Sequence, residues 1–475
     1  MSSSLHDLDR GTTGDPPDGV APRERPRDAP GRSLLYYGRL LGPLLAGYML
    51  FDKAFAYLHV PGTPLYVAEL VLVVGVIGCL AATGYLRAAI REDPVLTLLG
   101  AFFLWGLIRF LPGLRTYGIN AVRDFALVYY CLFAFFTAAV LMKAPYLLSR
   151  WMRQLTRFVP WLMIWLPLGI VLQAVVSHAP NVPNTQVSVL THKTGDAAVA
   201  ALIALAALWL FPRGRRTRSR AVWSVVALVT IVLAGTQNRG GLLAVTVGAV
   251  IGLALAPNRR WLVARAVSIV AIALAMGILL SVKIPVTGGQ GRTFSISQLV
   301  ANVASIGGAQ EAGNLSGTVN GRELLWSQVL DKQMADGLII EGYGFGPNIA
   351  LLAGGVEAEG TPSDPLRSPH NSHLDIIARL GIVGFFIWLA LWACWYRRMF
   401  AGCRRLAERG LHARRSVAVL CLMTVTSILV SAFFDPQLEG AQIAALMWTG
   451  FGVGVVVTSF RAWFRDQDLV LDPSQ

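Results

Sequence analysis

Long apolar windows recur along most of this chain, and they constrain its fold more than any other feature. About twelve windows contain roughly 17 to 23 mostly apolar residues, the length that a helix needs to cross the hydrocarbon core of a membrane. They lie near residues 34–51, 64–85, 94–111, 120–142, 158–177, 195–211, 221–236, 240–256, 261–281, 374–396, 416–434 and 440–460. Because 55% of the 475 residues are hydrophobic and 14% are charged, the sequence predicts an all-α, polytopic membrane protein.

Basic residues lie in short runs between the apolar windows. If the N-terminus is cytoplasmic, every even-numbered gap is an inside loop, and these gaps carry the basic runs, for example at 213–220 and 404–415. This pattern follows the positive-inside rule. The net charge of +14 is therefore explained by membrane insertion rather than by binding to nucleic acid. The five cysteines have no metal-ligand spacing and predict no disulfide framework.

The windows divide the chain into five parts. Residues 1–33 are rich in Asp, Arg, Pro, Gly and Ser and predict a disordered cytoplasmic tail. Residues 34–281 hold nine predicted transmembrane helices, 282–371 form a large external loop, 372–462 hold three more helices, and 463–475 form a second cytoplasmic tail. The external loop is far longer than a usual connection between helices.

One segment of the external loop, at about residues 321–336, has the pattern of an amphipathic helix. Leu324, Leu325, Val329 and Met334 recur there at near-helical spacing. We expect this helix to lie on or near the membrane surface, where it could cover a cavity.

Basic residues on the predicted outer side are candidates for binding a ligand, because the positive-inside rule removes most Lys and Arg from such loops. A guanidinium group can bind two phosphate oxygens at once, so several arginines on one face suit a diphosphate. The candidates are Arg115, Arg123, Lys193, Arg239 and Arg322.

Each of three arginines has a competing structural interpretation. Arg239 lies in a tight, glycine-containing turn at residues 236–241, which allows close approach of a ligand, but it could instead extend to lipid headgroups. Arg322 could pair with its neighbour Glu323. Arg123 could form a structural pair with Asp124, although ionisable residues within a membrane are functional candidates by default.

Residues 368–375 carry the strongest candidate for acid–base chemistry. Ser372 and Asp375 have the spacing of a capping box, which predicts that a helix begins there with His370 and Asn371 just before it. The start of a helix favours anions, and a neutral histidine can accept a proton near pH 7. This arrangement predicts a base beside a phosphate leaving group. The alternative is that the histidine only caps or hydrogen-bonds the loop.

Two motifs are missing from the sequence. The predicted outer side has neither a Cys/His cluster of the zinc type nor a short Asp-x-Asp pair, so a tightly bound catalytic metal is not indicated. The chain also lacks a phosphate-binding loop of the Gly-Lys-Ser kind, which argues against a nucleotide-driven machine.

Taken together, these segments resemble the O-antigen ligase and polymerase superfamily of bacterial surface polysaccharide assembly. The resemblance rests on about twelve helices with a large external loop before the last three, and on the order of several short motifs. These are Arg239-Gly240, Gly321-Arg322 followed by Trp326, the glycine-rich segment 342–346, the segment His370-Asn371-Ser372-His373-Leu374, and Gly381 with Gly384.

The resemblance implies a GT-C-like fold in the bacterial cytoplasmic membrane and an inverting, metal-independent glycosyl transfer on its outer face. The donor would be a glycan on undecaprenyl diphosphate, and the acceptor a hydroxyl of another glycan or of a lipid. Arg239 and Arg322 would hold the diphosphate, His370 would be the general base, and Asn371 would orient it. Arg115, Arg123 and Lys193 would assist with the diphosphate, and the substrate loop would include Trp326, Gly344, Gly346 and His373.

Two other classes of function compete with the enzyme. A transporter or flippase of lipid-linked saccharide also commonly has about twelve helices, but such carriers are built from repeated halves with sites at the membrane midplane. This sequence shows no repeat, and its charges gather at the external boundary. A non-catalytic scaffold would tolerate replacement of His370. Ligase and polymerase differ only in the acceptor, which the sequence does not identify.

Overall fold

The computed structural model describes residues 32–63, 65–176, 179–185, 187–211, 217–256, 284–285, 293–295, 299, 316–354 and 367–459. Residues 1–31 of the predicted N-terminal tail, the predicted tail at 463–475 and the predicted helix at 261–281 lie outside these residues. The last two residues of the predicted N-terminal tail, 32 and 33, instead begin the first helix.

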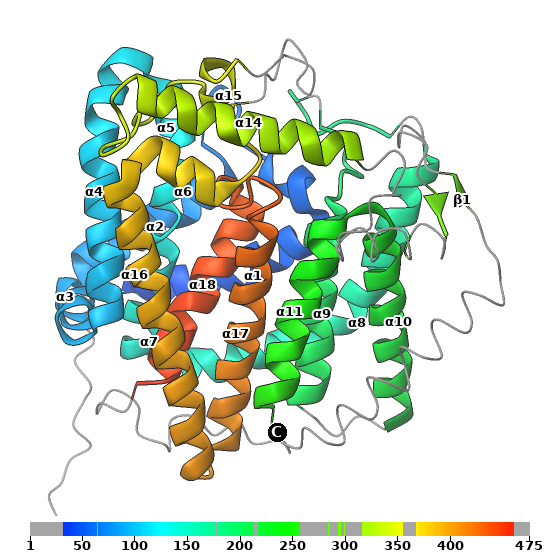
Figure 1. The fold of residues 1–475 in the computed structure, drawn as a ribbon. Helices are drawn as coiled ribbons and strands as arrows, with labels where there is room; N and C mark the ends of the chain where they lie inside the picture. The colour runs from blue at the N-terminus through cyan, green and yellow to red at the C-terminus, as the bar shows by residue number, and fades with distance from the viewer. Residues whose placement is uncertain are drawn as a thin grey trace, which may run out of the picture.

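The described part of the chain is almost wholly helical, as the apolar windows predict (Figure 1). Its helices are α1 (Arg32–Ala56), α2 (Val67–Ala81), α3 (Thr83–Glu92), α4 (Pro94–Tyr117), α5 (Ile119–Asp124), α6 (Ala126–Tyr129), α7 (Leu132–Lys143), α8 (Tyr146–Val175), α9 (Thr194–Leu210), α10 (Thr217–Gln237), α11 (Arg239–Leu255), α14 (Ser316–Ala335), α15 (Ile349–Leu352), α16 (Ser372–Glu408), α17 (His412–Ser431) and α18 (Ala441–Val457). Two short strands, β1 (Ile284–Pro285) and β2 (Thr293–Phe294), pair antiparallel.

Many of these helices have the length and composition of membrane-spanning helices. Within the described ranges, six are long and apolar enough to cross a membrane. Two bent pairs would add a span each, namely α2 with α3, bent by 90°, and the α5–α6 segment with α7, bent by 48°. Three more apolar helices, α9, α11 and α18, are shorter. The total of about twelve, the place of the long loop between the ninth and tenth helices, and the GT-C-like fold stay predictions.

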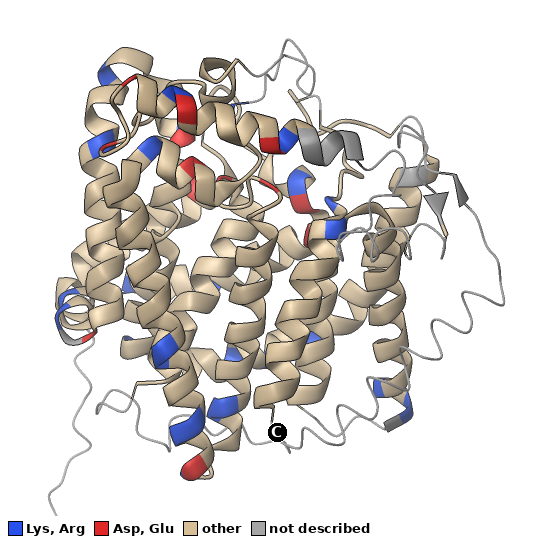
Figure 2. Cartoon of the chain, viewed as in Figure 1, with Lys and Arg blue, Asp and Glu red and all other residues tan. Residues whose placement is uncertain are grey.

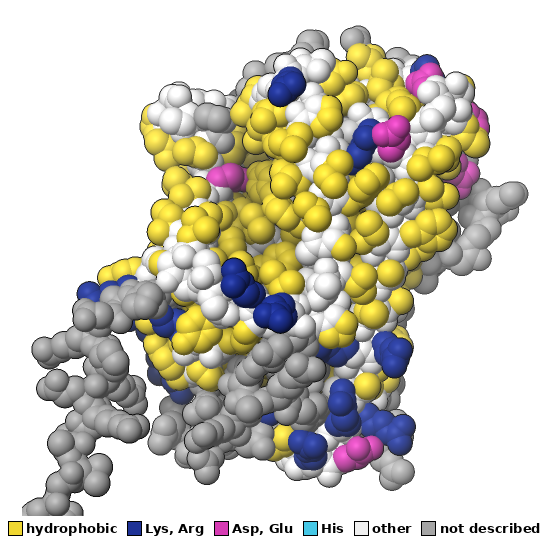
Figure 3. All heavy atoms as spheres, turned by 90° about the vertical axis from the view of Figure 1, so that its left-hand side faces the viewer, with side chains coloured by type: hydrophobic (Ala, Val, Ile, Leu, Met, Phe, Trp, Pro, Cys, Tyr) yellow, Lys and Arg dark blue, Asp and Glu magenta, His cyan; other side chains and the backbone are white. Residues whose placement is uncertain are grey.

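The bundle is held together by contacts between helices that are distant in the sequence. Helix α7 packs on α18, α4 on α16, and α11 on α17. Small residues allow these close approaches, since a Cβ on Gly452 would lie 2.6 Å from the backbone oxygen of Ala134. The outer surface is also apolar, and Figure 3 shows hydrophobic side chains over the middle of one face.

Helix α14 crosses the end of the bundle rather than running along it (Figure 1). A helix was predicted in this part of the loop, and α14 confirms it. Val329 is buried against Ile349 of α15 and Leu374 of α16. Leu324 and Met334 remain 59% and 56% exposed, because neighbouring elements cover one side of the helix.

Helix α16 is broken near its start. Gly381 has a φ of 65°, a left-handed conformation that glycine adopts without strain. The backbone N–H of Ile382 donates to the carbonyl of Ile339 (2.9 Å). The segment that follows α14 therefore fills the break and fixes residues 372–380 against the end of the bundle that α14 crosses.

Candidate functional site

The turn at residues 432–440, between α17 and α18, connects several elements at the end of the bundle that α14 crosses. The backbone N–H of Ser372 donates to the carbonyl of Ala432 (2.8 Å), and that of Leu438 donates to the hydroxyl of Ser372 (3.2 Å). The Arg322 guanidinium donates to the carbonyl of Phe434 (2.9 Å). The 432–440 turn thus joins the start of α16 to α14.

His370 lies beside this turn in a constrained backbone conformation. Its φ of 53° is unusual for a residue other than glycine. Such a conformation persists where the surroundings fix it. On one side the Trp326 indole donates to the carbonyl of Pro369 (2.8 Å), and on the other Ser372 is bonded to the turn. The His370 Nδ1 lies 3.9 Å from the Asp435 Oδ1.

The cap of α16 differs from the predicted capping box of Ser372 and Asp375. The N-cap is Asn371, whose side-chain oxygen accepts from the backbone N–H groups of His373 (3.0 Å) and Leu374 (3.2 Å). The capping-box prediction is wrong because both of its side chains have other partners. Ser372 binds the 432–440 turn, and the Asp375 carboxylate pairs with Arg379 at 3.0 Å.

Lys193, just before α9, also reaches the 432–440 turn. Its Nζ lies 2.9 Å from the Asp435 Oδ2. Burial would raise the pKa of the Asp435 carboxyl, but Lys193 and His370 lower it well below its usual range. Burial would lower the pKa of the Lys193 ammonium, but Asp435 and Asp196 raise it above its usual value. Both groups are therefore charged at neutral pH.

Arg239 begins α11 directly after a tight turn, as predicted. Asn238 caps the helix, and its side chain accepts from the backbone N–H of Gly241 (2.8 Å). A Cβ on Gly240 would lie 2.7 Å from the Cβ of Phe434, so the absence of a side chain brings this helix start against the 432–440 turn. The Arg239 side chain is half-buried there.

Arg322 has hydrogen-bonding capacity left. In the described part of the chain its ion pair with Glu323, the structural alternative, is not formed. Its Nε is buried without a hydrogen-bond partner among the described residues. A buried donor without a partner is costly, which is consistent with a ligand that accepts from it.

Arg115 and Arg123 lie elsewhere on the same end of the bundle. Both are exposed, on α4 and α5, which Figure 1 shows on the side of the bundle away from α10 and α11. The neighbour of Arg123, Asp124, accepts from Arg367 (2.9 Å) and Arg379 (3.0 Å). Figure 2 shows that acidic and basic residues lie together at this end of the molecule.

Gly344 and Gly346 allow the glycine-rich segment to pack against α4. Their φ angles are 72° and 116°, and a Cβ would lie 2.9 Å from the Arg109 oxygen and 2.4 Å from the Tyr117 ring, respectively. The Gly346 backbone N–H donates to Asp124 (3.1 Å). These glycines have a packing role, and their contact with substrate stays a prediction.

His373 joins α16 to α17. Its Nδ1 accepts from the Trp388 indole (3.2 Å), so its Nε2 is the nitrogen that donates to the carbonyl of Leu429 (3.0 Å). These bonds require a neutral imidazole. Like Trp326, His373 supports the site through packing, and its place in a substrate loop is still a prediction.

Asp435 is the main residue that the sequence analysis missed. A signal existed, since it is an acid in a short turn between two apolar windows. Its proximity to His370 and Lys193 depends on the fold. In the described ranges, no three His, Cys, Asp or Glu side chains are grouped so that they could hold a metal ion.

Comparison with known proteins identifies one domain. Residues 225–389 match the O-Antigen ligase family, and this confirms the resemblance to the O-antigen ligase and polymerase superfamily. The match includes Arg239, Arg322 and His370, but Lys193 and Asp435 lie outside it. No curated protein matches the chain.

Proposed function

We propose, from the premise that residues 225–389 form an O-antigen ligase domain, that this protein transfers a glycan from undecaprenyl diphosphate to an acceptor hydroxyl on the outer face of a bacterial cytoplasmic membrane. The reaction inverts the anomeric centre and uses no metal. The acceptor belongs to a glycan or a lipid, as in the synthesis of lipopolysaccharide or exopolysaccharide.

The convergence of His370, Arg322 and the start of α11 on the 432–440 turn carries this proposal. Arg322 donates to Phe434, Gly240 packs against Phe434, and His370 lies beside Asp435. These elements come from three separate parts of the sequence. Such a group of a base and cations supports transfer from a lipid-linked diphosphate better than transport, which needs a site near the membrane midplane.

In the proposed reaction, the His370 imidazole removes the proton of the acceptor hydroxyl. The acceptor oxygen then forms a bond to the anomeric carbon, and the bond from that carbon to the diphosphate oxygen breaks. The electron pair leaves with the diphosphate, whose added negative charge is stabilised by Arg239 and Arg322. Fixed cations in a partly buried site stabilise such a charge more effectively than water does.

Asp435 acts through His370 as a positioning residue. Its carboxylate lies 3.9 Å from Nδ1, which leaves Nε2 to accept the proton from the acceptor. A carboxylate next to a catalytic histidine orients the ring and stabilises the imidazolium that forms. Lys193 holds the other oxygen of Asp435 at 2.9 Å and keeps the carboxylate charged.

The remaining candidates have less direct roles in this proposal. Asn371 fixes the backbone after His370 by capping α16. Arg115 and Arg123 are exposed on α4 and α5, where they would attract the anionic donor before it enters the site.

Purified full-length protein incubated with a lipid-diphosphate glycan, without nucleotide or added metal, tests this function. We expect release of the diphosphate carrier together with a longer glycan or a glycosylated anchor. His370→Ala should reduce the rate by about 100-fold or more, the usual contribution of a general base. Arg322→Ala should have a similar effect, because it removes a cation that acts on the leaving group.

The matched controls are His412→Ala and Arg404→Ala, which replace the same residue types at the opposite end of the bundle. Both should keep wild-type rates. Intact donor after incubation with the wild-type protein would exclude the enzyme and favour a transporter. Wild-type product from His370→Ala would exclude the proposed base.

A further inference from the structure

A bend between α2 and α3 creates a distinct surface at the end of the bundle opposite to the candidate site. The two helices meet at 90°, so α3 lies across the end of the bundle rather than along it. Figure 1 shows α3 at this end, far from α14. The arginine-rich ends of α16 and α17 project from this end of the bundle, below α3 in the view of Figure 2, and the positive-inside rule assigns this end to the cytoplasm.

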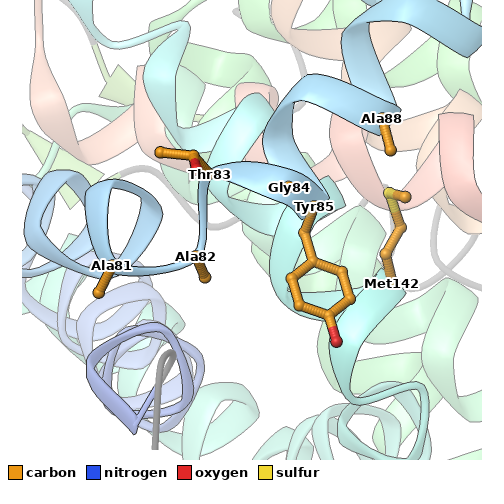
Figure 4. Close-up of a pocket in the computed structure, with 7 residues that line it drawn as sticks. All are labelled: Ala81, Ala82, Thr83, Gly84, Tyr85, Ala88 and Met142. Carbon is orange, nitrogen blue, oxygen red and sulfur yellow. The ribbon is translucent and has the colours of Figure 1, made fainter.

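A hollow opens at this bend (Figure 4). It has a volume of about 610 Å³ and is lined by Ala81, Ala82, Thr83, Gly84, Tyr85, Ala88 and Met142. Most of these side chains are small, and a Cβ on Gly84 would meet no atom within 4 Å. The hollow is therefore open space on the protein surface rather than a gap filled by side chains.

Two arginines border the hollow. Gly84 and Ala88 line it, and Arg87 and Arg91 follow them by three residues each, so the two pairs form adjacent rows on α3. Both arginines are exposed. Neither forms an ion pair with an acid whose side chain the structure describes, whereas Arg398 pairs with Asp93 and Arg404 with Glu408 at the same end.

An apolar strip on α2 leads away from the hollow into the membrane region. Val73, Ile77 and Leu80 are 48%, 54% and 71% exposed, and they recur at helical spacing along one side of α2. Figure 3 shows exposed hydrophobic side chains on the face that carries α3 and α4, with Lys and Arg below them. An apolar strip, an open hollow and two cations follow one another from the membrane interior towards its surface.

We propose that this surface binds one anionic phospholipid of the cytoplasmic leaflet. The acyl chains lie along the exposed side of α2, the glycerol region occupies the hollow, and the phosphate pairs with Arg87 and Arg91. The order of these three parts matches the order of polarity in a phospholipid. Basic pockets at the cytoplasmic side of membrane helices are suited to anionic headgroups. This site is independent of the proposed glycosyl transfer.

The test measures lipid retention. The full chain is reconstituted in bilayers with equal amounts of phosphatidylglycerol and phosphatidylcholine, then extracted, and the lipids that stay bound are quantified by native mass spectrometry. We expect the wild-type protein to retain phosphatidylglycerol preferentially. In the double variant Arg87→Gln, Arg91→Gln, the preference for phosphatidylglycerol over phosphatidylcholine should fall by roughly fivefold for each arginine removed. The double variant Arg404→Gln, Arg405→Gln, which removes two exposed charges from α16, is the control and should retain it.

Gly84→Phe tests the hollow separately from the charges. A Cβ at this position meets no atom within 4 Å, and the ring attached to it would occupy the space assigned to the glycerol region. Retention of phosphatidylglycerol should fall although both arginines remain. Equal retention of the two lipids by the wild-type protein would overturn the proposal. Unchanged retention in either the double arginine variant or Gly84→Phe would also overturn it.

Discussion

Two groups of charged residues at the end of the bundle that α14 crosses differ in their burial and in the distances between partners. In the first, Asp124, Asp375 and Arg379 are 4% exposed or less, and Arg379 binds both carboxylates at 3.0 Å. In the second, Asp435 and His370 are more than a fifth exposed and 3.9 Å apart. Both groups lie beside segments that the sequence analysis selected, so charge alone does not distinguish them.

The difference indicates which group has a structural role. In the first group, the Asp124 carboxylate accepts hydrogen bonds from Arg379, from Arg367 and from the backbone N–H of Gly346. In the second, the His370–Asp435 contact is 3.9 Å long, and the Arg322 Nε has no hydrogen-bond partner among the described residues. We therefore expect changes in the first group to affect stability and changes in the second to affect turnover.

Arg379→Met should have the largest effect on stability. It leaves two buried carboxylates without their shared cation, which typically costs about 3 to 5 kcal/mol. The measurement is the thermal unfolding temperature of the protein in detergent. Arg404→Met on the exposed end of α16 is the control and should stay within about 0.5 kcal/mol. An Arg379→Met protein as stable as the wild type would contradict the structural role of the first group.

Asp435→Asn should affect turnover more than stability. The amide keeps the size of the side chain but loses the charge that stabilises an imidazolium, so we expect kcat to fall by about 100-fold or more. KM should change little, because Asp435 acts through His370 and not on the donor. The control is Asp336→Asn, at the exposed end of α14. An unchanged kcat would show that the contact between His370 and Asp435 has no role in turnover.

Gly344→Ala should have a smaller effect, on stability. Its φ of 72° disfavours any side chain, and a Cβ at this position would lie 2.9 Å from the Arg109 oxygen. A cost of about 1 to 3 kcal/mol is usual for such strain. Gly321→Ala meets no atom within 4 Å and lies inside α14, where alanine is favoured over glycine, so it should not destabilise the protein. Equal unfolding temperatures of the two variants would contradict the packing role of Gly344.

The smallest expected effect is the change with pH in the contribution that the Lys193–Asp435 ion pair makes to folding stability. The pKa of Asp435 is lowered in the folded protein, so its stabilising contribution is complete above the unfolded value of about 3.9 and is lost as pH falls further. The pKa of Lys193 is raised, so its contribution is complete below about 10.4 and is lost above it. The stability difference between wild type and Asp435→Asn should therefore decrease as pH falls below about 3.9. A difference that stayed constant as pH fell through this range would contradict the lowered pKa of Asp435.

Local sequence patterns predicted several elements at the correct positions. The turn before Arg239 and the helix around Val329 were both expected, because helical spacing and glycine-containing turns depend on neighbouring residues. The capping box at Ser372 was wrong, since its side chains bind the 432–440 turn and Arg379. A contact between residues that lie 60 or more positions apart, such as Ser372 with Ala432, leaves no local pattern in the sequence.

The sequence by itself determined that the chain forms helices apolar enough to cross a membrane. Each spanning segment must satisfy its own backbone hydrogen bonds and present apolar side chains to the lipid, and both requirements leave a pattern in the sequence. It also supplied His370, Arg239 and Arg322 as candidates through residue type and place in the chain. Only the tertiary structure decided that Asp435 lies beside His370 and that Asp124 pairs with Arg379 instead of serving a ligand. These contacts depend on how α4, α14, α16 and the 432–440 turn pack, and packing is a property of the whole bundle.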